Sequence, residues 1–474
     1  MCVQFLKIKS VLPSAQKFAF LPCGKCEECR DSKKNEWTFR LRTELEWCRR
    51  HKWNIGFFTL TYNDACLPRL PREVFNSAPV ADIPCFSRSD ARLFIDNVRK
   101  RLNERWNVAG CKYILCCEYG SSTKRPHMHG LISFPSSYEV VDKVTGEVTT
   151  LPLDPRNVFD LIKSQWSLGF VFPRDFRGGR DSHGYEHKPF LLRGDIAGAA
   201  KYAAKYCCKD LDFYRSIDGL DLDKKSKLYK RCMPFHIQSR SIGLCLLDNL
   251  SNDELLKLFK SGKSFLGDNK THSLPLYIRN KVLFSPRYEF KECKFGDWWY
   301  DFQDNKWRYK RGQGTHKRYV RREVTQFFVD NIKEIYAKRV EHYEDLFSRF
   351  TDSRFWLSRG APVSDAALFA DTAGRLSVGY GLNASRAAES YLLYFGISRD
   401  RCFAPSSVPP ELQFLSRYKP LHFSRRCAPV SDVLYEHINR YFSFVVDCLK
   451  FVSSVDVQKR AELRRLVDLY RHSI

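Results

Sequence analysis

Residues 118–130 read Glu-Tyr-Gly-Ser-Ser-Thr-Lys-Arg-Pro-His-Met-His-Gly, and the rest of the chain is best understood from them. If residues 127–133 form a strand, alternation places His127 and His129 on one face and Met128 on the other. A hairpin turn before the histidines would return the chain and bring the Glu118 carboxylate alongside them. Two nitrogens and one oxygen form half of a metal site, with open positions for a substrate. The pattern fits two ordinary strand histidines equally well, so it needs a second motif.

The flanking segments predict the fold class. Residues 53–62 and 112–118 are rich in β-branched and aromatic residues, which is typical of strands, and residues 127–134 would be the hairpin partner of the second. Residues 89–106 carry apolar side chains at four-residue intervals after Ser89, a typical N-cap, and predict a helix. This order predicts an α+β domain, with a mainly antiparallel sheet and its helices on one side.

The second motif is a tandem Tyr-x-x-Lys within residues 195–210. This alanine-rich segment begins with an aspartate, so it predicts a capped helix. Tyr202 and Tyr206 are four residues apart and would share a face, and Lys205 and Lys209 each follow a tyrosine by three residues. Alone, the segment also fits an amphipathic helix with two packed tyrosines and a basic stripe.

The pairing of these two motifs predicts a phosphate-transfer chemistry. A tyrosine hydroxyl has an ordinary pKa of roughly 10, and a nearby ammonium and a metal-bound phosphate would both favour its phenolate. Attack on DNA would displace a 3′-oxygen and leave a 5′-phosphotyrosine, while a metal polarises the scissile phosphate. Two tyrosines would allow two successive cleavages, the first attaching the protein to DNA and the second releasing and rejoining the strand.

A cysteine cluster near the start predicts a structural metal. Cys23, Cys26 and Cys29 follow one another at three-residue intervals, and Cys2 is the candidate fourth ligand. Such spacing aims the sulfurs at one tetrahedral Zn²⁺. Reduced cysteines near a turn are the alternative.

Composition indicates the class of partner. The 474 residues carry a formal net charge of +25, which favours a polyanion, with nucleic acid ahead of an anionic membrane surface. No run of 18 apolar residues exists, so no membrane-spanning segment is expected. The 18 cysteines include adjacent pairs, which suit a reducing cytoplasm.

Together these features resemble the HUH endonuclease superfamily of rolling-circle replication initiators. More closely, they are similar to the replication initiation proteins of microviruses, the small single-stranded DNA phages of the gokushovirus kind. The resemblance is carried by residues 22–30, 58–62, 118–129 and 202–206, with weaker matches at 239–243 and 274–281.

The resemblance implies roles for individual residues. His127, His129 and Glu118 match the ligands of a catalytic divalent cation, Mg²⁺ or Mn²⁺. Tyr202 and Tyr206 match the paired nucleophiles. Lys205 matches an assisting lysine, and Lys209 is assigned the same role from the tandem repeat.

The implied function is nicking and rejoining of single-stranded origin DNA, which starts rolling-circle replication of a small circular phage genome. The implied partners are that DNA and the helicase and polymerase of a host bacterium, in whose cytoplasm the protein would work. Two alternatives stay open: a relaxase or transposase of the same chemistry, or a zinc-containing DNA-binding protein without catalysis.

Three parts are predicted along the chain. Residues 1–50 would hold the cysteine cluster and a helix whose outer face is basic, residues 51–245 the HUH domain, and residues 246–474 a mainly helical, basic accessory region. Within the last, residues 298–322 interleave aromatic and basic side chains. They fit a single-strand contact surface or a solvated basic edge equally well.

Overall fold

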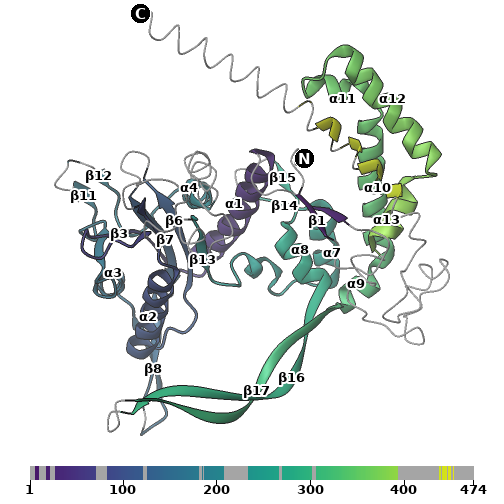
Figure 1. Ribbon diagram of the computed structural model, residues 1–474. Helices are drawn as coiled ribbons and strands as arrows, with labels where there is room; N and C mark the ends of the chain where they lie inside the picture. The colour runs from purple at the N-terminus through teal and green to yellow at the C-terminus, as the bar shows by residue number, and fades with distance from the viewer. Residues whose placement is uncertain are drawn as a thin grey trace, which may run out of the picture. The chain divides into compact units, whose positions relative to one another are not determined.

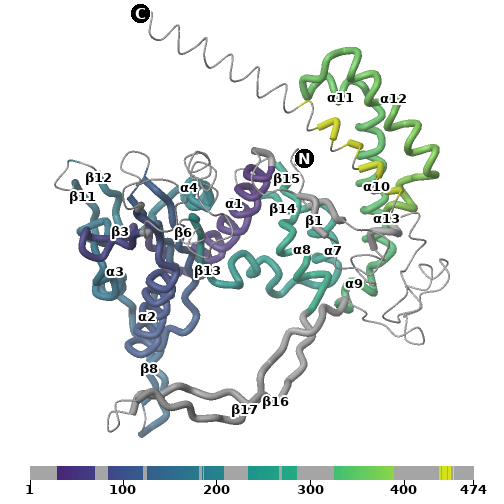
Figure 2. The backbone as a smooth tube through the Cα atoms, in the orientation of Figure 1, coloured from purple at the N-terminus to yellow at the C-terminus, as the bar shows by residue number. Residues whose placement is uncertain are grey.

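A computed structural model describes most of the chain. The residues it describes are 6–9, 18–21, 27–70, 83–120, 125–142, 144–180, 184, 186–207, 233–265, 270–301, 306–392, and 437, 438, 440–442, 444, 445, 447–449 and 452. Contacts divide the chain into two units, one of residues 29–250 and one of residues 1–28 with 251–474 (Figure 2). The predicted boundaries at residues 50 and 245 stay predictions, because such contacts do not test which part folds alone.

The unit of residues 29–250 is built on a five-stranded sheet in the order β10-β3-β7-β6-β13 (Figure 1). Every neighbouring pair is antiparallel, so the predicted α+β class with a mainly antiparallel sheet is confirmed. Its strands are β3 (Asn54–Tyr62), β6 (Lys112–Tyr119), β7 (Pro126–Phe134), β10 (Gly169–Phe172) and β13 (His236–Gln238).

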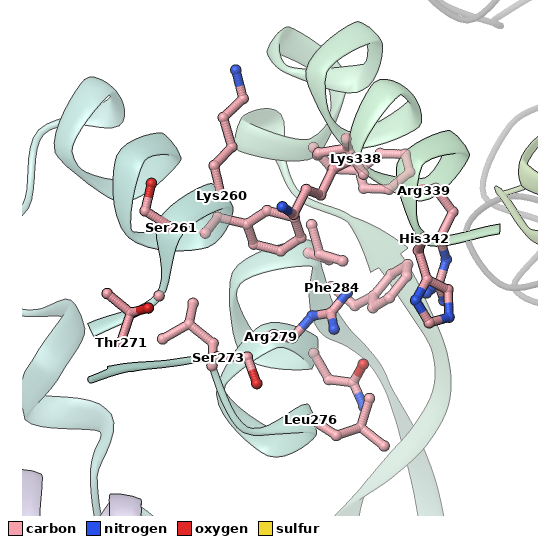
Figure 3. Close-up of a pocket in the computed structure, with 17 residues that line it drawn as sticks. Lys260, Ser261, Thr271, Ser273, Leu276, Arg279, Phe284, Lys338, Arg339 and His342 are labelled. Atoms are coloured by element: carbon pink, nitrogen blue, oxygen red, sulfur yellow. The ribbon is translucent and has the colours of Figure 1, made fainter. Parts of the chain in front are cut away.

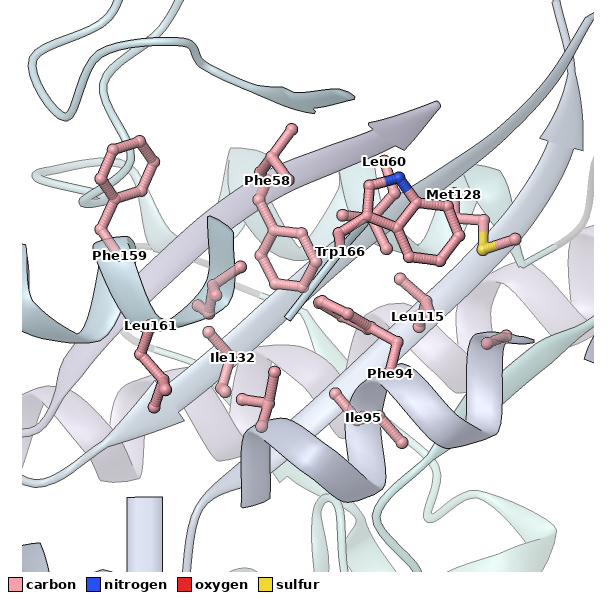
Figure 4. Close-up of a cluster of buried hydrophobic side chains, with 14 of the residues drawn as sticks. Phe58, Leu60, Phe94, Ile95, Leu115, Met128, Ile132, Phe159, Leu161 and Trp166 are labelled. Carbon is pink, nitrogen blue, oxygen red and sulfur yellow. The ribbon is translucent and has the colours of Figure 1, made fainter. Parts of the chain in front are cut away.

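One face of this sheet is covered by α2 (Arg88–Trp106) and α3 (Pro155–Ser164). Alternate residues of the central strands, such as Phe58 and Met128, pack against Phe94 in a buried apolar cluster (Figure 4). The helix α2 has Ser87 as its N-cap, two residues earlier than predicted.

The opposite face is covered by α1 (Glu27–Arg50) and α4 (Ile196–Tyr206). Ile55, Ile114 and Leu131 point to this side and are buried against both helices. The prediction that all helices lie on one side was therefore wrong. The central strands carry apolar residues on both faces, so both need a cover.

Shorter elements complete this unit. The predicted polar insertion after β7 is an antiparallel hairpin of two strands. The elements are β4 (Arg69–Leu70), β5 (Ile83–Pro84), β8 (Ser137–Val141), β9 (Val148–Pro152), β11 (Gly179–Arg180), β12 (Glu186–His187) and the 3₁₀ helix η2 (Leu244–Leu247).

The second unit contains helices, as predicted, and a long antiparallel strand pair that was not predicted. That pair, β16 (Phe284–Asp301) with β17 (Lys306–Val324), is rich in charged residues, which weakens the apolar alternation that indicates a strand. None of the described helices is long and apolar enough to cross a membrane. The other elements are β1 (Leu6–Lys9), β2 (Phe18–Leu21), α7 (Asn252–Ser261), β14 (Lys263–Ser264), β15 (Thr271–His272), α8 (Leu276–Leu283), α9 (Gln326–Asp330), α10 (Ile332–Phe350), α11 (Ser353–Ser358), α12 (Val363–Gly379) and α13 (Ala384–Leu392), and the described residues between 437 and 452 are helical.

Candidate functional site

The two histidines lie on β7, the central strand of the five-stranded sheet. His127 and His129 face the side covered by α1 and α4, while Met128 is buried on the side of α2. The predicted alternation is therefore confirmed. The hairpin of β6 and β7 pairs Glu118 with His127, so the predicted carboxylate stands directly across from the first histidine. The sheet itself thus sets the spacing of these three side chains.

A hydrogen-bonded row crosses the sheet at His129. Its Nε2 lies 2.9 Å from Glu118 Oε1, and its Nδ1 lies 2.9 Å from Thr59 Oγ1 on β3. Contacts at both ring nitrogens fix the plane of the imidazole. Glu118 is only 6% exposed, so its carboxylate acts at close range in a medium that screens charge weakly.

The helix α4 brings both predicted tyrosines to this row. Asp195 caps the helix by accepting a hydrogen bond from the amide of Gly198 at 2.8 Å. The Tyr206 ring stacks on the His129 ring with 4.0 Å between centroids. The Tyr206 hydroxyl donates to the Tyr202 hydroxyl oxygen at 2.6 Å, which confirms the predicted shared face. Two motifs some seventy residues apart in sequence therefore form one site.

The two tyrosines differ in their surroundings. Tyr202 is 46% exposed and Tyr206 is 9% exposed. Burial raises the pKa of Tyr206 above the ordinary value for tyrosine, and the hydrogen bond to Tyr202 and the negative charge of Glu118 add to the shift. Tyr206 therefore keeps its proton at neutral pH and donates it in a hydrogen bond, while Tyr202 presents its oxygen to solvent.

Two residues of β3 belong to the site that sequence reasoning did not select. Phe57 packs its ring edge-on to Tyr202 at 5.4 Å between centroids and stacks on His129 at 6.1 Å. Thr59 holds the second nitrogen of His129. A signal was present, since Thr59 and Thr61 are polar residues alternating with apolar ones in a strand that otherwise reads as buried.

The metal ligands predicted from the sequence come only partly together. Ligands on adjacent octahedral positions at about 2.1 Å from a cation lie about 3 Å apart, and the His129–Glu118 separation of 2.9 Å fits this as well as a direct hydrogen bond. The His127 Nε2 instead lies beside the backbone of Gly120, where an added Cβ would meet it at 2.9 Å. As these side chains stand, no three His, Cys, Asp or Glu residues in the described part of the chain converge on one point. Since His127 is the cross-strand partner of Glu118, rotation of its ring would complete the set.

The remaining predicted residues are placed as follows. Lys205 is exposed in the last turn of α4, one residue before Tyr206. Lys209 and three of the four cysteines, Cys2, Cys23 and Cys26, lie outside the described residues. Cys29 is a free, half-buried cysteine on α1. The zinc site therefore stays a prediction.

The fold and the site define an α+β domain in which a capped helix sets two tyrosines against a strand that carries a histidine pair. Comparison with known proteins points the same way. Residues 55–211 match the model of a family described as replication-associated protein ORF2. This segment contains the whole of the site described above.

Two curated relatives are phage proteins. One is the replication-associated protein ORF2 of Spiroplasma virus 4, 34% identical over 109 residues, which is 23% of this chain and 30% of the relative. The other is the replication-associated protein VP4 of Bdellovibrio phage phiMH2K, 33% identical over 128 residues, 26% of this chain and 34% of the relative. The chain thus spans about a third of the length of these relatives. No solved structure matches it significantly.

Proposed function

We propose that the unit of residues 29–250 contains an HUH-type endonuclease that nicks and rejoins single-stranded DNA, starting rolling-circle replication of a small circular phage genome. The observation that carries this proposal is the contact between α4 and β7, where Tyr206 stacks on His129 and holds the oxygen of Tyr202. A purely structural helix would not need two tyrosine hydroxyls joined to each other beside a histidine–carboxylate pair. The names of the matched phage relatives support a role in replication.

In this proposal Tyr202 makes the first cut. Its oxygen attacks the scissile phosphorus, a bond forms between them, and the bond from phosphorus to the 3′-oxygen breaks. The tyrosine proton leaves to solvent, and the departing 3′-oxygen takes up a proton to become a hydroxyl. The products are a 5′-phosphotyrosine and a free 3′-hydroxyl that a host polymerase can extend.

Tyr206 supports that step before it acts itself. A hydrogen bond donated to the Tyr202 oxygen stabilises negative charge as it develops there. Because burial keeps Tyr206 protonated, this donor persists at neutral pH. In a second round Tyr206 would attack in turn, once Tyr202 carries the DNA and the hydrogen bond between the hydroxyls is broken.

The donors that would hold a divalent cation are His127, His129 and Glu118. Such a cation, Mg²⁺ or Mn²⁺, would polarise the scissile phosphate when bound. The protein's own contribution is to orient the donors: Thr59 fixes the ring of His129, and the β6–β7 hairpin sets Glu118 opposite His127.

The experiment that tests the function is incubation of the full chain with single-stranded origin DNA and Mg²⁺ or Mn²⁺. We expect cleavage with the protein joined covalently to the 5′ side, seen as a shifted band on a denaturing gel. Combined substitution Tyr202→Phe and Tyr206→Phe should remove the adduct. An adduct that persists in this double variant would show that neither tyrosine is the nucleophile.

A histidine variant separates catalysis from DNA binding. We expect His127→Ala to lose metal-dependent cleavage while it keeps salt-sensitive binding of the same DNA, measured by fluorescence anisotropy. If nicking survives this substitution, the metal site is wrong. If the wild-type protein binds DNA and never cleaves it, the alternative of a DNA-binding protein without catalysis is correct.

A further inference from the structure

A cavity of about 340 Å³ lies within the unit that contains residues 251–474, apart from the tyrosine site. Its walls come from α7, α8 and α10 and from the chain around β15 (Figure 3). Pockets that bind small organic ligands in proteins usually measure about 300–1,000 Å³, so one nucleotide unit could enter.

The lining is strongly cationic. Lys260, Arg279, Lys338 and Arg339 contribute four positive charges, and no aspartate or glutamate is among the described residues that form the wall. Lys338 does pair with Glu341, at 3.3 Å between Nζ and Oε2, but that carboxylate is not part of the lining. Concave surfaces lined by one sign of charge concentrate the opposite charge, so this cavity favours an anion.

A histidine at the wall senses these charges. Burial lowers the pKa of His342, and the positive charges of Arg339 and Arg279 lower it further, against an opposing effect of Asp345. His342 is therefore neutral at neutral pH. It can accept or donate a hydrogen bond there without adding to the repulsion between the arginines.

The same cavity offers aromatic surface and hydroxyl groups. Phe259, Phe284 and Phe328 line it, and the Arg279 guanidinium carbon stands 5.3 Å from the centroid of the Phe259 ring. Three hydroxyl side chains, Ser261, Thr271 and Ser273, complete the wall. Flat rings accept the face of a nucleobase, and guanidinium groups bind phosphate oxygens in pairs.

We propose that this cavity binds a nucleoside phosphate, with the phosphate at Arg279 and Arg339 and the base against Phe259 or Phe284. The site goes beyond the proposed nicking activity and does not depend on it, because it shares no residue with the tyrosine site. Its ligand is either a free nucleotide or one unit of a DNA strand, and both present the same chemistry to the cavity.

Photocrosslinking distinguishes these two sources. The full chain is irradiated with 5-iodo-deoxyuridine monophosphate, or with a single strand of ten nucleotides that contains one 5-iodo-deoxyuridine, and crosslinked peptides are mapped by mass spectrometry. We expect crosslinks at Phe259, Phe284 or His342. Capture of the strand alone identifies a strand-binding site, and capture of the monophosphate identifies a nucleotide site. No crosslink at these residues with either probe would overturn the proposal.

Matched substitutions test the cause. Arg279→Ala should lower crosslinking in the cavity by roughly tenfold, since charge-assisted hydrogen bonds to phosphate are lost. Because Arg279 packs on Phe259, a second variant protects against misfolding: Lys260→Glu, exposed in the last turn of α7. Its control is Lys257→Glu, which is exposed one turn earlier in α7 and does not line the cavity. Equal loss in the Lys260 and Lys257 variants would refute a specific site, and unchanged strand crosslinks at the tyrosine site would keep the two proposals separate.

Discussion

Tyr202 and Tyr206 sit on one helix, yet their different exposure predicts different defects when each is replaced. Tyr202→Phe removes the proposed first nucleophile, so the first covalent adduct should fall by about 100-fold or more. Tyr206→Phe removes the hydrogen bond to the Tyr202 oxygen, so the first adduct should fall by only about tenfold. The measurement is adduct formed per minute on a labelled strand.

The second step reverses this order. With Tyr206→Phe the adduct should accumulate, because no second tyrosine is present to attack and release it. An adduct that forms at wild-type rate in Tyr202→Phe and is lost in Tyr206→Phe would assign the first cut to Tyr206.

His236 on β13 gives the domain a defined pH dependence. Burial lowers its pKa to about 4, and the charges of Lys33, Arg40 and Arg88 contribute. The lowered pKa stabilises the fold above the ordinary histidine pKa of about 6.5, and this stability is lost as pH falls from there toward 4. Between pH 7 and pH 5 the loss should be up to about 2 kcal/mol.

Urea unfolding at both pH values checks this prediction. His236→Gln removes the ring that packs edge-on to Trp37, so this variant should be less stable at pH 7. Its stability should change less than that of the wild type on going to pH 5. Parallel pH profiles for the two proteins would show that His236 is not the group that titrates.

The identity of the site residues was largely predictable from the sequence, and their exact geometry was not. The period of two in a strand and the four-residue repeat in a helix determine which side chains share a face, so the His127–His129 and Tyr202–Tyr206 pairs could be predicted. The role of Arg40 could not be. It was expected on a basic outer face of α1, but it is buried, where it donates to the carbonyl of Ile242 at 3.2 Å. That contact joins residues far apart in the chain, which local pattern does not encode.

At the scale of the helix, capping of α4 should matter twice, for stability and for the site. Asp195→Ala removes the bond to the Gly198 amide and should lower the free energy of unfolding by about 1 kcal/mol. It should also lower adduct formation, because the first turn that orients the tyrosine helix loosens. Thermal unfolding and the adduct assay measure the two effects.

A matched cap on another helix is the control. Asp154 caps α3 by accepting from the Arg156 amide at 2.9 Å, on the opposite face of the sheet from the tyrosines. Asp154→Ala should cost similar stability and leave adduct formation nearly unchanged. If both variants lose nicking equally, general destabilisation and not the tyrosine helix is responsible.

Among the elements, strands with strong apolar alternation were predicted within a few residues, and those with charged sequences were not. Residues 127–134 read as a strand and form β7 at Pro126–Phe134. The long pair β16 and β17 was missed because charged residues replace the apolar face. The two-sided cover of the sheet was also missed. Which face a helix covers depends on contacts such as those of Trp37 and Leu41 with Ile114, which a single sequence does not specify.

At the scale of the whole molecule, the net charge of +25 predicts DNA binding that weakens steeply with salt. If about five phosphates are contacted, raising monovalent salt from about 50 to about 200 mM should weaken single-strand binding about 100-fold. Fluorescence anisotropy of a labelled strand measures it. The Tyr202→Phe and Tyr206→Phe double variant should show the same salt slope, since it changes no charge. A flat salt dependence would contradict phosphate contact as the main source of affinity.

The place of the histidines on the central strand has a consequence for how the site opens. The strand β7 is paired on both sides, with β3 and with β6, whereas α4 is a helix of 11 residues held by one face. Backbone amides of β7 should therefore exchange with deuterium far more slowly than those of α4. A fluctuation that releases the tyrosines toward DNA would leave the histidine row intact, so each round of exchange between strands would start from the same fixed template.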